Sequence, residues 1–523
     1  MLLPKFTVSG DHVQVTDDTI VAETSIPTPE VVVEGETAVV VERMRRLVFR
    51  TSTHVPRVGL MLVGLAGNNG TTVATSILAN RQKIQWEERT GTKTPNFLGS
   101  VTQATTIKVG ETATGEDVHV PFSSVLPMVD PRDIVVSGWD INGANLYDAA
   151  KRAQVMEPDL LRQLRPELET MHPLPGVYFP SFIAANQADR ADNVLEGSVQ
   201  MQLDRVRADI RQFKADNELD KVVVVWTATT EKCVEIVEGV NDTAANLQAS
   251  LEAGTTGVSP STVYGVAAVL EDTPFMNGSP QNAIVPGLAE LARERGVLLG
   301  GDDFKSGQTK FKSCMAEFLV SSGFRLGSIA SYNHLGNNDG LNLSSQEQFR
   351  SKEISKSGVI DDIIAGNEIL YPPGHKAAGP KSGSTKAVDH CVVIKYIPYV
   401  GDSKRALDEY SSEIFMGGRN TISVTNVCED SLLAAPIIID LCVLSELFSR
   451  VEVQVPGEGD VPAHWEPCCS VATPLSFFFK APLNKQGGRD GVVNALFTQR
   501  RGLENLVRAM SGLPLTNDIP AIY

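Results

Sequence analysis

The feature that most constrains the fold is an alternation between wholly apolar segments and amphipathic segments, which begins near residue 57. The apolar segments have strand length and read RVGLMLVG, DIVVSGWD, KVVVVWTATT and GVLLGGDD, and segments such as SVQMQLDRVRADIRQFKADNEL and NDTAANLQASLEAG between them have helical periodicity. Strands that are apolar on both faces belong to a sheet that helices cover on both sides. The alternation therefore predicts an α/β fold with a parallel sheet.

The length and charge of the chain limit its class. Its 523 residues, 42% hydrophobic and 21% charged, are enough for a large core and about two or three domains. The 46 Lys and Arg against 63 Asp and Glu give a net charge of −17. This acidity argues against nucleic acid or an anionic membrane as the main partner. An anionic ligand would need a local basic cluster.

Cysteine usage and the apolar segments bear on the compartment. The seven cysteines are scattered and form no Cys-x-x-Cys pair. Pro4 and Lys5 interrupt the short apolar start, and the most apolar helix candidate, SLLAAPIIIDLCVLSELF, carries Asp440 and Glu446. The eight histidines show no metal-ligand spacing. We therefore expect a cytosolic protein without a bound metal.

The pattern changes along the chain and suggests four parts. Short alternating pieces up to about residue 55 indicate edge strands or an arm. After about residue 325, longer strand candidates such as RLGSIASYNHL and CVVIKYIPYV follow, with the Gly-, Pro- and Lys-rich segment Tyr371 to Ala387 between them as a predicted mobile surface loop. This resembles a second domain inserted before the first is complete. The predicted parts are 1–55 (arm), 56–324 (first domain), 325–430 (insertion) and 431–523 (return to the first domain).

The segment VGLAGNNGTT, 63–72, has the features of a nucleotide-binding turn. Gly64, Gly67 and Gly70 lie three residues apart, and a helix beginning near Thr71 would direct its free N–H groups and positive end at a pyrophosphate. Ala66 stands where the usual dinucleotide fingerprint has its second glycine, so its methyl group narrows the approach. A purely structural turn is the alternative.

A ribose partner is harder to find in the sequence. No strand candidate ends in an acidic residue about twenty positions after the turn, where one is expected. Asp140, which closes the strand candidate IVVSGWD, is the best substitute. Its alternative role is to cap the turn that follows.

The segment GGDDFKSGQTKFKS, 300–313, contains a second anion-binding candidate. Gln308, not lysine, follows Gly307, so the segment is not an ATP-binding P-loop and a kinase is disfavoured. Ser306, Gly307, Gln308 and Thr309 open a predicted helix, whose N-terminus would suit a single phosphate group. An ordinary capped helix is the alternative.

Four lysines stand out by their surroundings. Ser344 and Glu347 predict a capping box, which would place Lys352 and Lys356 one turn apart on one helix face. A solvated face is the alternative for that pair, but the preceding loop gathers the polar side chains Asn333, Asn337, Asn338 and Asp339.

Lys404 and Lys480 are the other two. Lys404 lies beside Asp402 after an apolar strand end, and Lys480 follows the aromatic run SFFF. A lysine among aromatic side chains loses its proton more easily, which suits acid-base catalysis, although either side chain could instead extend to the surface. No Gly-x-Ser-x-Gly motif indicates a hydrolase.

Taken together, the motifs of this sequence resemble those of the eukaryotic inositol-3-phosphate synthase family. The resemblance rests on GNNG (67–70), SGWDIN (137–142), PSFIAANQ (180–187), GDDFKSGQTK (301–310), SYNHLGNNDGLNLS (331–344), FRSKEISKS (349–357), VGDSKRALDEY (400–410), CEDSLLAAP (428–436) and LNKQ after FFFKAPL. It covers nearly the whole chain and is weak over the first fifty residues. It implies a cytoplasmic homotetramer built on a Rossmann domain with an inserted α+β catalytic and tetramerisation domain.

The resemblance also implies a reaction. The family is an NAD-bound cyclase that converts D-glucose 6-phosphate to 1D-myo-inositol 3-phosphate, the first step of inositol and phosphoinositide biosynthesis. Hydride is removed from carbon 5, the hydrogens on carbon 6 become acidic, the enolate attacks the carbon 1 aldehyde, and the hydride is returned. Negative charge develops on successive oxygens, which lysine ammonium groups can stabilise while relaying protons.

Site residues carry over by motif. The resemblance places Lys352 at the carbon 5 hydroxyl, with Lys480 and Lys404 around the carbonyl oxygens, and leaves the substrate phosphate as a candidate base at carbon 6. It implies that Lys356, Ser306, Gly307, Gln308 and Thr309 hold the phosphate. The other residues implied to line the site are Asp303, Asn333, Leu335, Asn337, Asp402 and Asp430.

The resemblance implies NAD contacts as well. Gly64, Gly67, Asn68, Asn69 and Gly70 would meet the pyrophosphate, with Asp140 near a ribose. Two positions depart from the family pattern: Ala66 replaces a glycine, and Ala228-Thr229 in WTATTEKC replaces Ala-Asn. We therefore expect NAD binding that is retained but weaker.

Two other functions compete with this interpretation. An NAD-dependent dehydrogenase of a sugar phosphate would share the glycine turn and a catalytic lysine, but it does not explain four lysines with two polar loops. A catalytically silent NAD-binding scaffold would not need Lys352, Lys356, Lys404 and Lys480 intact. Both remain alternatives at this point.

Overall fold

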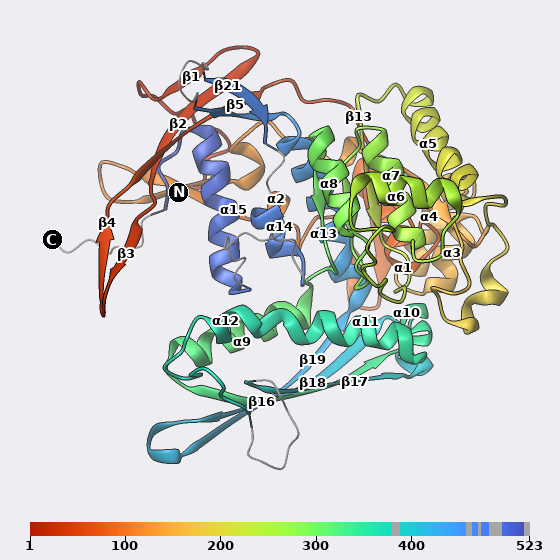
Figure 1. The fold of residues 1–523 in the computed structure, drawn as a ribbon. Coiled ribbons are helices and arrows are strands. Elements are labelled where there is room, and N and C mark those ends of the chain that lie inside the picture. Colours follow the sequence, from red (N-terminus) through yellow and green to blue (C-terminus); the bar gives the residue numbers. More distant parts are fainter. Residues whose placement is uncertain (378–386, 457–462, 469–471, 481–493, 517–523) are drawn as a thin grey trace.

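The computed structural model describes residues 1–377, 387–456, 463–468, 472–480 and 494–516 (Figure 1). Most of the predicted surface loop between Tyr371 and Ala387, and the LNKQ word at 483–486, lie outside the described residues.

A six-stranded parallel sheet forms the centre of the first domain. Its order is β12-β11-β6-β13-β14-β15, and every neighbouring pair is parallel. The strands are β6 (Val58–Val63), β11 (Val135–Asp140), β12 (Leu174–Pro175), β13 (Lys221–Trp226), β14 (Phe275–Asn277) and β15 (Leu299–Gly300). In chain order this is 3-2-1-4-5-6, the doubly wound Rossmann order. The predicted parallel α/β sheet is confirmed.

Alternate residues of the central strands enter two separate cores. Leu60 and Leu62 belong to the core on one face and Met61 and Val63 to the core on the other. The first face is covered by α1 (Asn68–Gln82), α3 (Leu146–Ala153), α4 (Pro158–Leu168) and α13 (Asp430–Phe448), and the second by α5 (Val199–Asp216), α6 (Ala244–Ala253), α7 (Pro260–Leu270) and α8 (Pro286–Arg295). Burial on both faces explains why these strands are apolar throughout.

The four-stranded sheet after residue 324 has the order β17-β16-β18-β19. Its strands are β16 (Arg325–Leu335), β17 (Asp389–Tyr396), β18 (Ser403–Glu413) and β19 (Arg419–Glu429). A helical layer with α9 (Gly307–Ser321), α11 (Gln346–Ser357) and α12 (Asp361–Ala365) lies over one face (Figure 1), and the short α10 (Asn338–Asn342) follows β16. Side chains of β18 alternate between buried and exposed, so Lys404 and Asp408 face the helical layer.

The predicted capping box at Ser344 is wrong. Helix α11 begins at Gln346 after Ser345, and the Ser344 hydroxyl instead donates to the carbonyl of Leu341. Ser344 is thus used to close α10. Lys352 and Lys356 still lie one turn apart on α11, as predicted, and both are buried rather than solvated.

The two ends of the chain meet in a five-stranded sheet, β1-β2-β5-β20-β21. It joins β1 (Val13–Val15), β2 (Thr19–Pro27) and β5 (Met44–Ser52) to β20 (Val451–Val455) and β21 (His464–Pro467), and α15 (Leu496–Ser511) packs on β2 and β5. The first 55 residues therefore contribute to a shared sheet with the C-terminal part. The hairpin of β3 (Glu30–Glu34) and β4 (Thr37–Val41) extends from it (Figure 1).

Smaller elements complete the first domain. They are β7 (Trp86–Glu88), β8 (Gly91–Lys93), α2 (Val101–Ala104), β9 (Thr106–Glu111), β10 (Asp117–Pro121) and α14 (Ala472–Leu475). The boundaries predicted for the four parts of the chain stay predictions.

Helix α13 is the one helix of the described residues with the length and hydropathy of a membrane span, but 89% of its most apolar window is buried. Its two interior acids are used inside the fold. Asp440 accepts hydrogen bonds from the backbone N–H groups of Val101 and Thr102 at the start of α2, and Glu446 pairs with Arg450. These contacts identify α13 as a core helix.

Candidate active site

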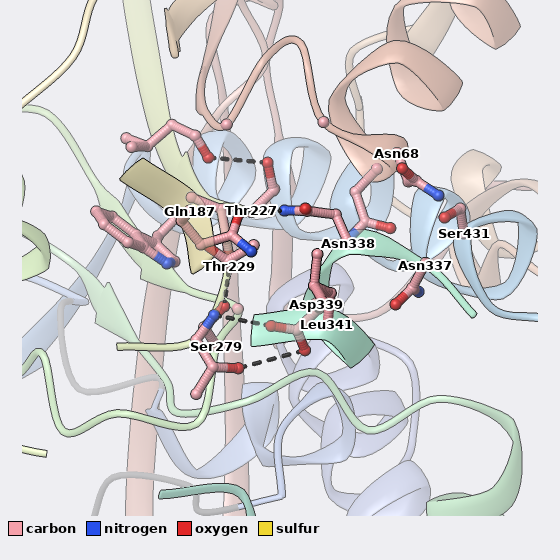
Figure 2. A pocket seen from close by; sticks show the side chains of 18 of the residues that line it. Asn68, Gln187, Thr227, Thr229, Ser279, Asn337, Asn338, Asp339, Leu341 and Ser431 are labelled. Atoms are coloured by element: carbon pink, nitrogen blue, oxygen red, sulfur yellow. Dashed lines mark hydrogen bonds between the residues drawn. The ribbon is translucent and has the colours of Figure 1, made fainter. Parts of the chain in front are cut away.

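A cavity of about 410 Å³ opens at the carboxyl ends of β6, β11 and β13 and extends to the four-stranded unit. Its walls include Val63, Asp140 and Trp226 from the parallel sheet, and Asn337 and Lys352 from the inserted unit. The cavity lies where β6 and β13 are neighbours and the strand order reverses, which is the usual ligand site of a doubly wound sheet. Figure 2 shows polar side chains from both units around it.

The glycine turn needs its glycines for its own geometry. Gly64 has φ +94°, and a Cβ there would lie 2.7 Å from the backbone N of Ala228. A Cβ on Gly70 would lie 2.4 Å from the carbonyl oxygen of Leu65. Helix α1 begins at Asn68, earlier than the predicted Thr71. The first-turn residues Asn68 and Asn69 therefore border the cavity at the helix N-terminus, where backbone N–H groups have no partner within the helix.

Asp140 stabilises this turn through backbone hydrogen bonds. Its Oδ2 accepts from the Ala66 N–H and its Oδ1 from the Asn142 N–H, both at 2.9 Å. Burial raises the pKa of Asp140, and these two backbone hydrogen bonds oppose that change. Asp140 also lines the cavity, so the capping role and a place at the site are combined in one residue. Contact with a ribose stays a prediction.

The end of β13 contributes a second wall that fits a dinucleotide. Thr227 donates to the Val63 carbonyl at 3.0 Å, which ties β13 to β6, and Ser279 donates to the Ala228 carbonyl at 2.8 Å. Trp226 lines the cavity, and its indole Nε1–H is a buried donor without a partner among the described residues. Such a donor fits a cavity that holds a polar ligand such as NAD.

The polar loop after β16 connects the two units. The Asp339 carboxylate accepts from the Thr230 N–H at 2.9 Å, Asn342 donates to the Thr230 carbonyl at 2.7 Å, and Asn338 donates to Gln187 at 2.9 Å. Figure 2 shows Gln187 and Asn338 meeting side by side. These partners at 187 and 230 were missed because nothing local in their sequence distinguishes them from ordinary loop residues.

Two lysines share one carboxylate in the cavity wall. Asp303 Oδ1 accepts from Lys352 Nζ at 3.1 Å and from Lys480 Nζ at 2.9 Å, and Asp303 Oδ2 accepts from the Ser355 hydroxyl. A third lysine, Lys404, donates to Asp430 Oδ1 at 3.1 Å. All three lysines and both aspartates line the cavity. The structure thus brings together three of the four predicted lysines.

The shared carboxylate separates the pKa values of its two lysines. Burial and the positive charges of Lys352 and Lys404 lower the pKa of Lys480 to about 7, although Asp303 opposes this. Burial also acts on Lys352, but Asp303, Asp339 and Asp430 together hold its pKa above the usual value. Against burial, the same two lysines lower the pKa of Asp303. At neutral pH the site therefore contains one firmly charged ammonium and one amine that can exchange a proton.

Asp402 links the glycine turn to the start of α13. Its Oδ2 accepts from the Ser431 N–H at 2.8 Å, and its Oδ1 accepts from the Ser431 hydroxyl at 2.8 Å and from Asn68 at 3.3 Å. Burial and the charge of Asp430 raise the pKa of Asp402. This carboxylate is a structural link at the edge of the cavity, beside Lys404 in β18.

The residues predicted for phosphate binding divide into two layers. Ser306 lines the cavity and precedes α9 without a side-chain capping hydrogen bond, so its hydroxyl is not used by the helix. The other residues predicted to hold the phosphate, Gly307, Gln308, Thr309 and Lys356, are not among the lining residues, and neither are Asn333 and Leu335, which were predicted to line the site. Lys356 Nζ donates to Gln308 Oε1 at 3.1 Å and to Asn333 Oδ1 at 2.8 Å.

Lys356 is buried close to several other lysines. Burial lowers its pKa well below the usual value, and the nearby charges of Lys404, Lys312, Lys480 and Lys352 add to that effect. A bound anion would reverse it. Lys312 is buried on α9 and contacts His390 at 2.9 Å, and no local pattern in the sequence distinguishes it.

Comparisons with known proteins identify the family of this chain. The family model described as Myo-inositol-1-phosphate synthase, an NAD-binding family, matches residues 58–508. The chain belongs to the myo-inositol-1-phosphate synthase family. An inositol-3-phosphate synthase of Sesamum indicum is 51% identical over the whole of both chains, and inositol-3-phosphate synthase 1 of Bos taurus is 52% identical over 98% of this chain and 89% of its own length.

A solved structure gives the same result. The crystal structure of inositol-3-phosphate synthase from Caenorhabditis elegans superposes with a TM-score of 0.92 at 45% identity, covering 99% of this chain and all of that one. The resemblance to the myo-inositol-1-phosphate synthase family is thus confirmed over the whole chain. This member of the family is an enzyme with NAD as its cofactor, and its Rossmann-type fold is confirmed.

Proposed function

We propose that this protein converts D-glucose 6-phosphate to 1D-myo-inositol 3-phosphate by oxidation at carbon 5, enolisation, intramolecular aldol closure and reduction, with no net redox change. The observation that carries the proposal is that Lys352, Lys404 and Lys480 all line the cavity beside the glycine turn. A dehydrogenase needs one proton acceptor, whereas a cyclase must stabilise negative charge that forms on several oxygens in turn. NAD, when bound, supplies the hydride acceptor and donor.

The first role concerns the hydroxyl on carbon 5. Its oxidation releases a proton, which needs a neutral amine. Lys352 and Lys480 both donate to Asp303 Oδ1, so a proton taken up by one lowers the proton affinity of the other. Because Lys480 has a pKa of about 7, the pair contains a neutral amine in a large fraction of molecules near neutral pH.

The second role concerns the enolate and the ring closure. Negative charge forms on oxygen 5 and then on oxygen 1, and Lys404 and Lys480 supply ammonium groups at the cavity wall. Asp430 keeps Lys404 in place at 3.1 Å. The substrate's phosphate is a candidate base at carbon 6, as the family resemblance implies.

The third role is binding of the phosphate. Helix α9 spans Gly307–Ser321, and its first N–H groups have no acceptor inside the helix. The positive end of the helix suits a phosphate at the cavity wall, as does the Ser306 hydroxyl, which makes no capping hydrogen bond. Lys356 lies behind this point, and the negative charge of a bound phosphate favours its protonated form. A dianionic phosphate would also reduce the repulsion among the buried lysines.

The assembly is proposed as a homotetramer. The face of the four-stranded sheet away from the helical layer carries Tyr332, Leu407 and Val427, which are 51%, 44% and 57% exposed. Tyr332 and Leu407 are directly paired across β16 and β18, so they form one apolar patch. An exposed patch of this kind marks an association surface.

The location is proposed as the cytoplasm, with no nucleic acid or membrane partner. Five cysteines, Cys233, Cys314, Cys391, Cys428 and Cys442, are thiols, which fits a reducing compartment. The net charge of −17 is unfavourable for binding nucleic acid or an anionic membrane surface.

One assay tests the proposed reaction. The purified protein is incubated with glucose 6-phosphate and NAD, and inositol phosphate and NADH are both measured. We expect inositol phosphate in many-fold excess over enzyme with no accumulation of NADH. Accumulation of NADH in step with substrate consumption would instead indicate a sugar-phosphate dehydrogenase, and absence of both products would indicate a silent scaffold.

A further inference from the structure

We propose that Asp408 is a positioning residue that fixes the side chain of Gln308 and, through it, the ammonium of Lys356. This inference deepens the proposed function and rests on it, because it assigns a support to the group that supplies charge to the substrate phosphate. Asp408 lies in β18 and is 4% exposed, and the family resemblance implies no role for it.

The contacts form a continuous buried chain. Gln308 Nε2 donates to Asp408 Oδ1 at 3.0 Å and to Ser331 Oγ at 3.0 Å, and it also lies 3.2 Å from Asp408 Oδ2. On the other side of the same amide, Gln308 Oε1 accepts from Lys356 Nζ at 3.1 Å. Gln308, Ser331 and Lys356 are all at most 5% exposed, so water does not compete with these bonds.

The chemistry of the two neighbours fixes which way the amide points. An ionised carboxylate only accepts hydrogen bonds, and an ammonium only donates them. The amide between them must therefore turn its NH₂ group to Asp408 and its oxygen to Lys356. In this orientation both N–H groups of Gln308 have partners, so its side chain has no donor left for a substrate. Gln308 thus acts on the phosphate through Lys356 and not directly.

The second acceptor of Lys356 is prepared in the same way. Asn333 Oδ1 accepts from Lys356 Nζ at 2.8 Å, while Asn333 Nδ2 lies 3.2 Å from the Val393 carbonyl and 3.3 Å from the Ser331 carbonyl. Both acceptors of Lys356 in the described residues are neutral amide oxygens. The position of Lys356 Nζ is therefore set by two amide oxygens, and the NH₂ group of each amide is held by its own acceptors.

The sheet register explains why the carboxylate of Asp408 lies next to the Gln308 amide. Asp408 is directly paired with Ser331 across β18 and β16, and both side chains face the helical layer. Gln308 reaches the two from the first turn of α9. The pairing joins two strands that are distant in the sequence, so no local motif reveals it.

The test uses an exchange of isosteric groups. In Asp408→Asn the new amide can donate to Gln308, which frees Gln308 to turn its NH₂ group toward Lys356. We expect the KM for glucose 6-phosphate to rise about tenfold, as loss of about one charged hydrogen bond implies, with kcat within about threefold of wild type. The Kd for NAD should stay unchanged. In Gln308→Glu two carboxylates face each other, and the KM should rise as well.

The double variant Gln308→Glu with Asp408→Asn decides between mechanisms. The asparagine introduced in β18 would donate to the new carboxylate, which accepts from Lys356, so the order of donors and acceptors is restored. We expect its KM to be at least about threefold below that of either single variant. KM increases that multiply in the double variant would overturn the proposal, because they would show that Asp408 and Gln308 act independently. If Asp408→Asn does not fold, the KM of the double variant is compared with that of Gln308→Glu alone.

Tyr410→Phe is the matched control. Tyr410 donates to Asp408 Oδ2 at 3.3 Å, so this variant removes the other side-chain contact of Asp408 and leaves Gln308 in place. We expect a KM within about twofold of wild type. A tenfold rise in this variant, or equal losses of NAD binding and kcat in Asp408→Asn, would show a merely structural role and overturn the proposal. Failure of the proposed function itself would be seen separately, as absence of inositol phosphate with the wild-type protein.

Discussion

At the scale of single residues, the site depends on one carboxylate serving two amines. Asp303 receives Lys352 and Lys480 on the same oxygen, and Ser355 occupies the other oxygen. This arrangement keeps one lysine charged and lets the other titrate near neutral pH. Groups whose environments push their pKa values apart are the usual acid and base of an enzyme. The four lysines were predictable from motifs, but Ser355 and Asp408 were not, because their roles depend on contacts across elements.

The pH dependence of kcat/KM tests this separation. Below pH 7 Lys480 is protonated and both amines are charged, so the carbon 5 hydroxyl has no base in the pair; above pH 7 Lys480 is neutral. We therefore predict that kcat/KM rises with pH through about 7. In Asp303→Asn the pKa of both lysines falls, so the rise in the remaining activity should move to lower pH. An unchanged midpoint in that variant would mean that the substrate phosphate titrates instead.

Lys352→Ala tests the role of the charged member. Loss of a general acid or base typically costs a hundredfold or more in rate, so we expect kcat to fall by about that factor while the Kd for NAD and the fold stay near normal. Activity can be measured as inositol phosphate formed, and NAD binding by calorimetry. Lys151→Ala, on the exposed face of α3, is the matched control and should keep full activity. Normal turnover of the Lys352 variant would refute its assignment.

At the scale of elements, apolar patterning was enough to find the strands, whereas helix starts were not predictable to the residue. The strands of the parallel sheet are apolar because both faces are buried. Helix α1 begins at Asn68 because the turn from Gly64 folds tightly against Leu65 and Ala228, and α11 begins at Gln346 because Ser344 is used by α10. Such starts depend on backbone geometry that a spacing rule does not contain.

The glycine turn allows a test at this scale. In Gly70→Ala the added Cβ would lie 2.4 Å from the Leu65 carbonyl oxygen and 2.5 Å from that of Gly64, so the turn must open. We predict a Kd for NAD raised by about tenfold or more, with a lower melting temperature, because overpacking costs about 1–3 kcal/mol. Gly110→Ala is the control, since its Cβ meets nothing within 4 Å. Equal NAD affinity in the two variants would separate this turn from the cofactor.

At the scale of the whole molecule, two segments from the C-terminal part of the chain pack against elements formed much earlier in the sequence. Helix α13 completes the core beside α1, and β20 pairs with β5, joining Val451 to Thr51. The apolar pattern indicated an insertion and a return but identified no partner for the first 55 residues. Pairing between segments this far apart depends on the finished fold, and short alternating strands are compatible with many partners.

The uncovered face of the four-stranded sheet gives a prediction about assembly. Leu407→Glu places a charge in the patch with Tyr332 and Val427, so we expect the tetramer to dissociate into smaller species in sedimentation velocity experiments. Met201→Glu changes an exposed apolar residue on α5, which packs on the parallel sheet, and should leave the tetramer intact. A wild-type monomer, or a Leu407 variant that sediments as wild type, would contradict the proposed interface.

The central claim is a redox cycle that closes on one substrate molecule. The most direct measurement uses glucose 6-phosphate with deuterium at carbon 5 and follows the label by mass spectrometry and NMR. The account predicts that the inositol phosphate formed retains the deuterium on the carbon derived from carbon 5, with no label in free NADH. Inositol phosphate without deuterium, or deuterium appearing in free NADH, would contradict it.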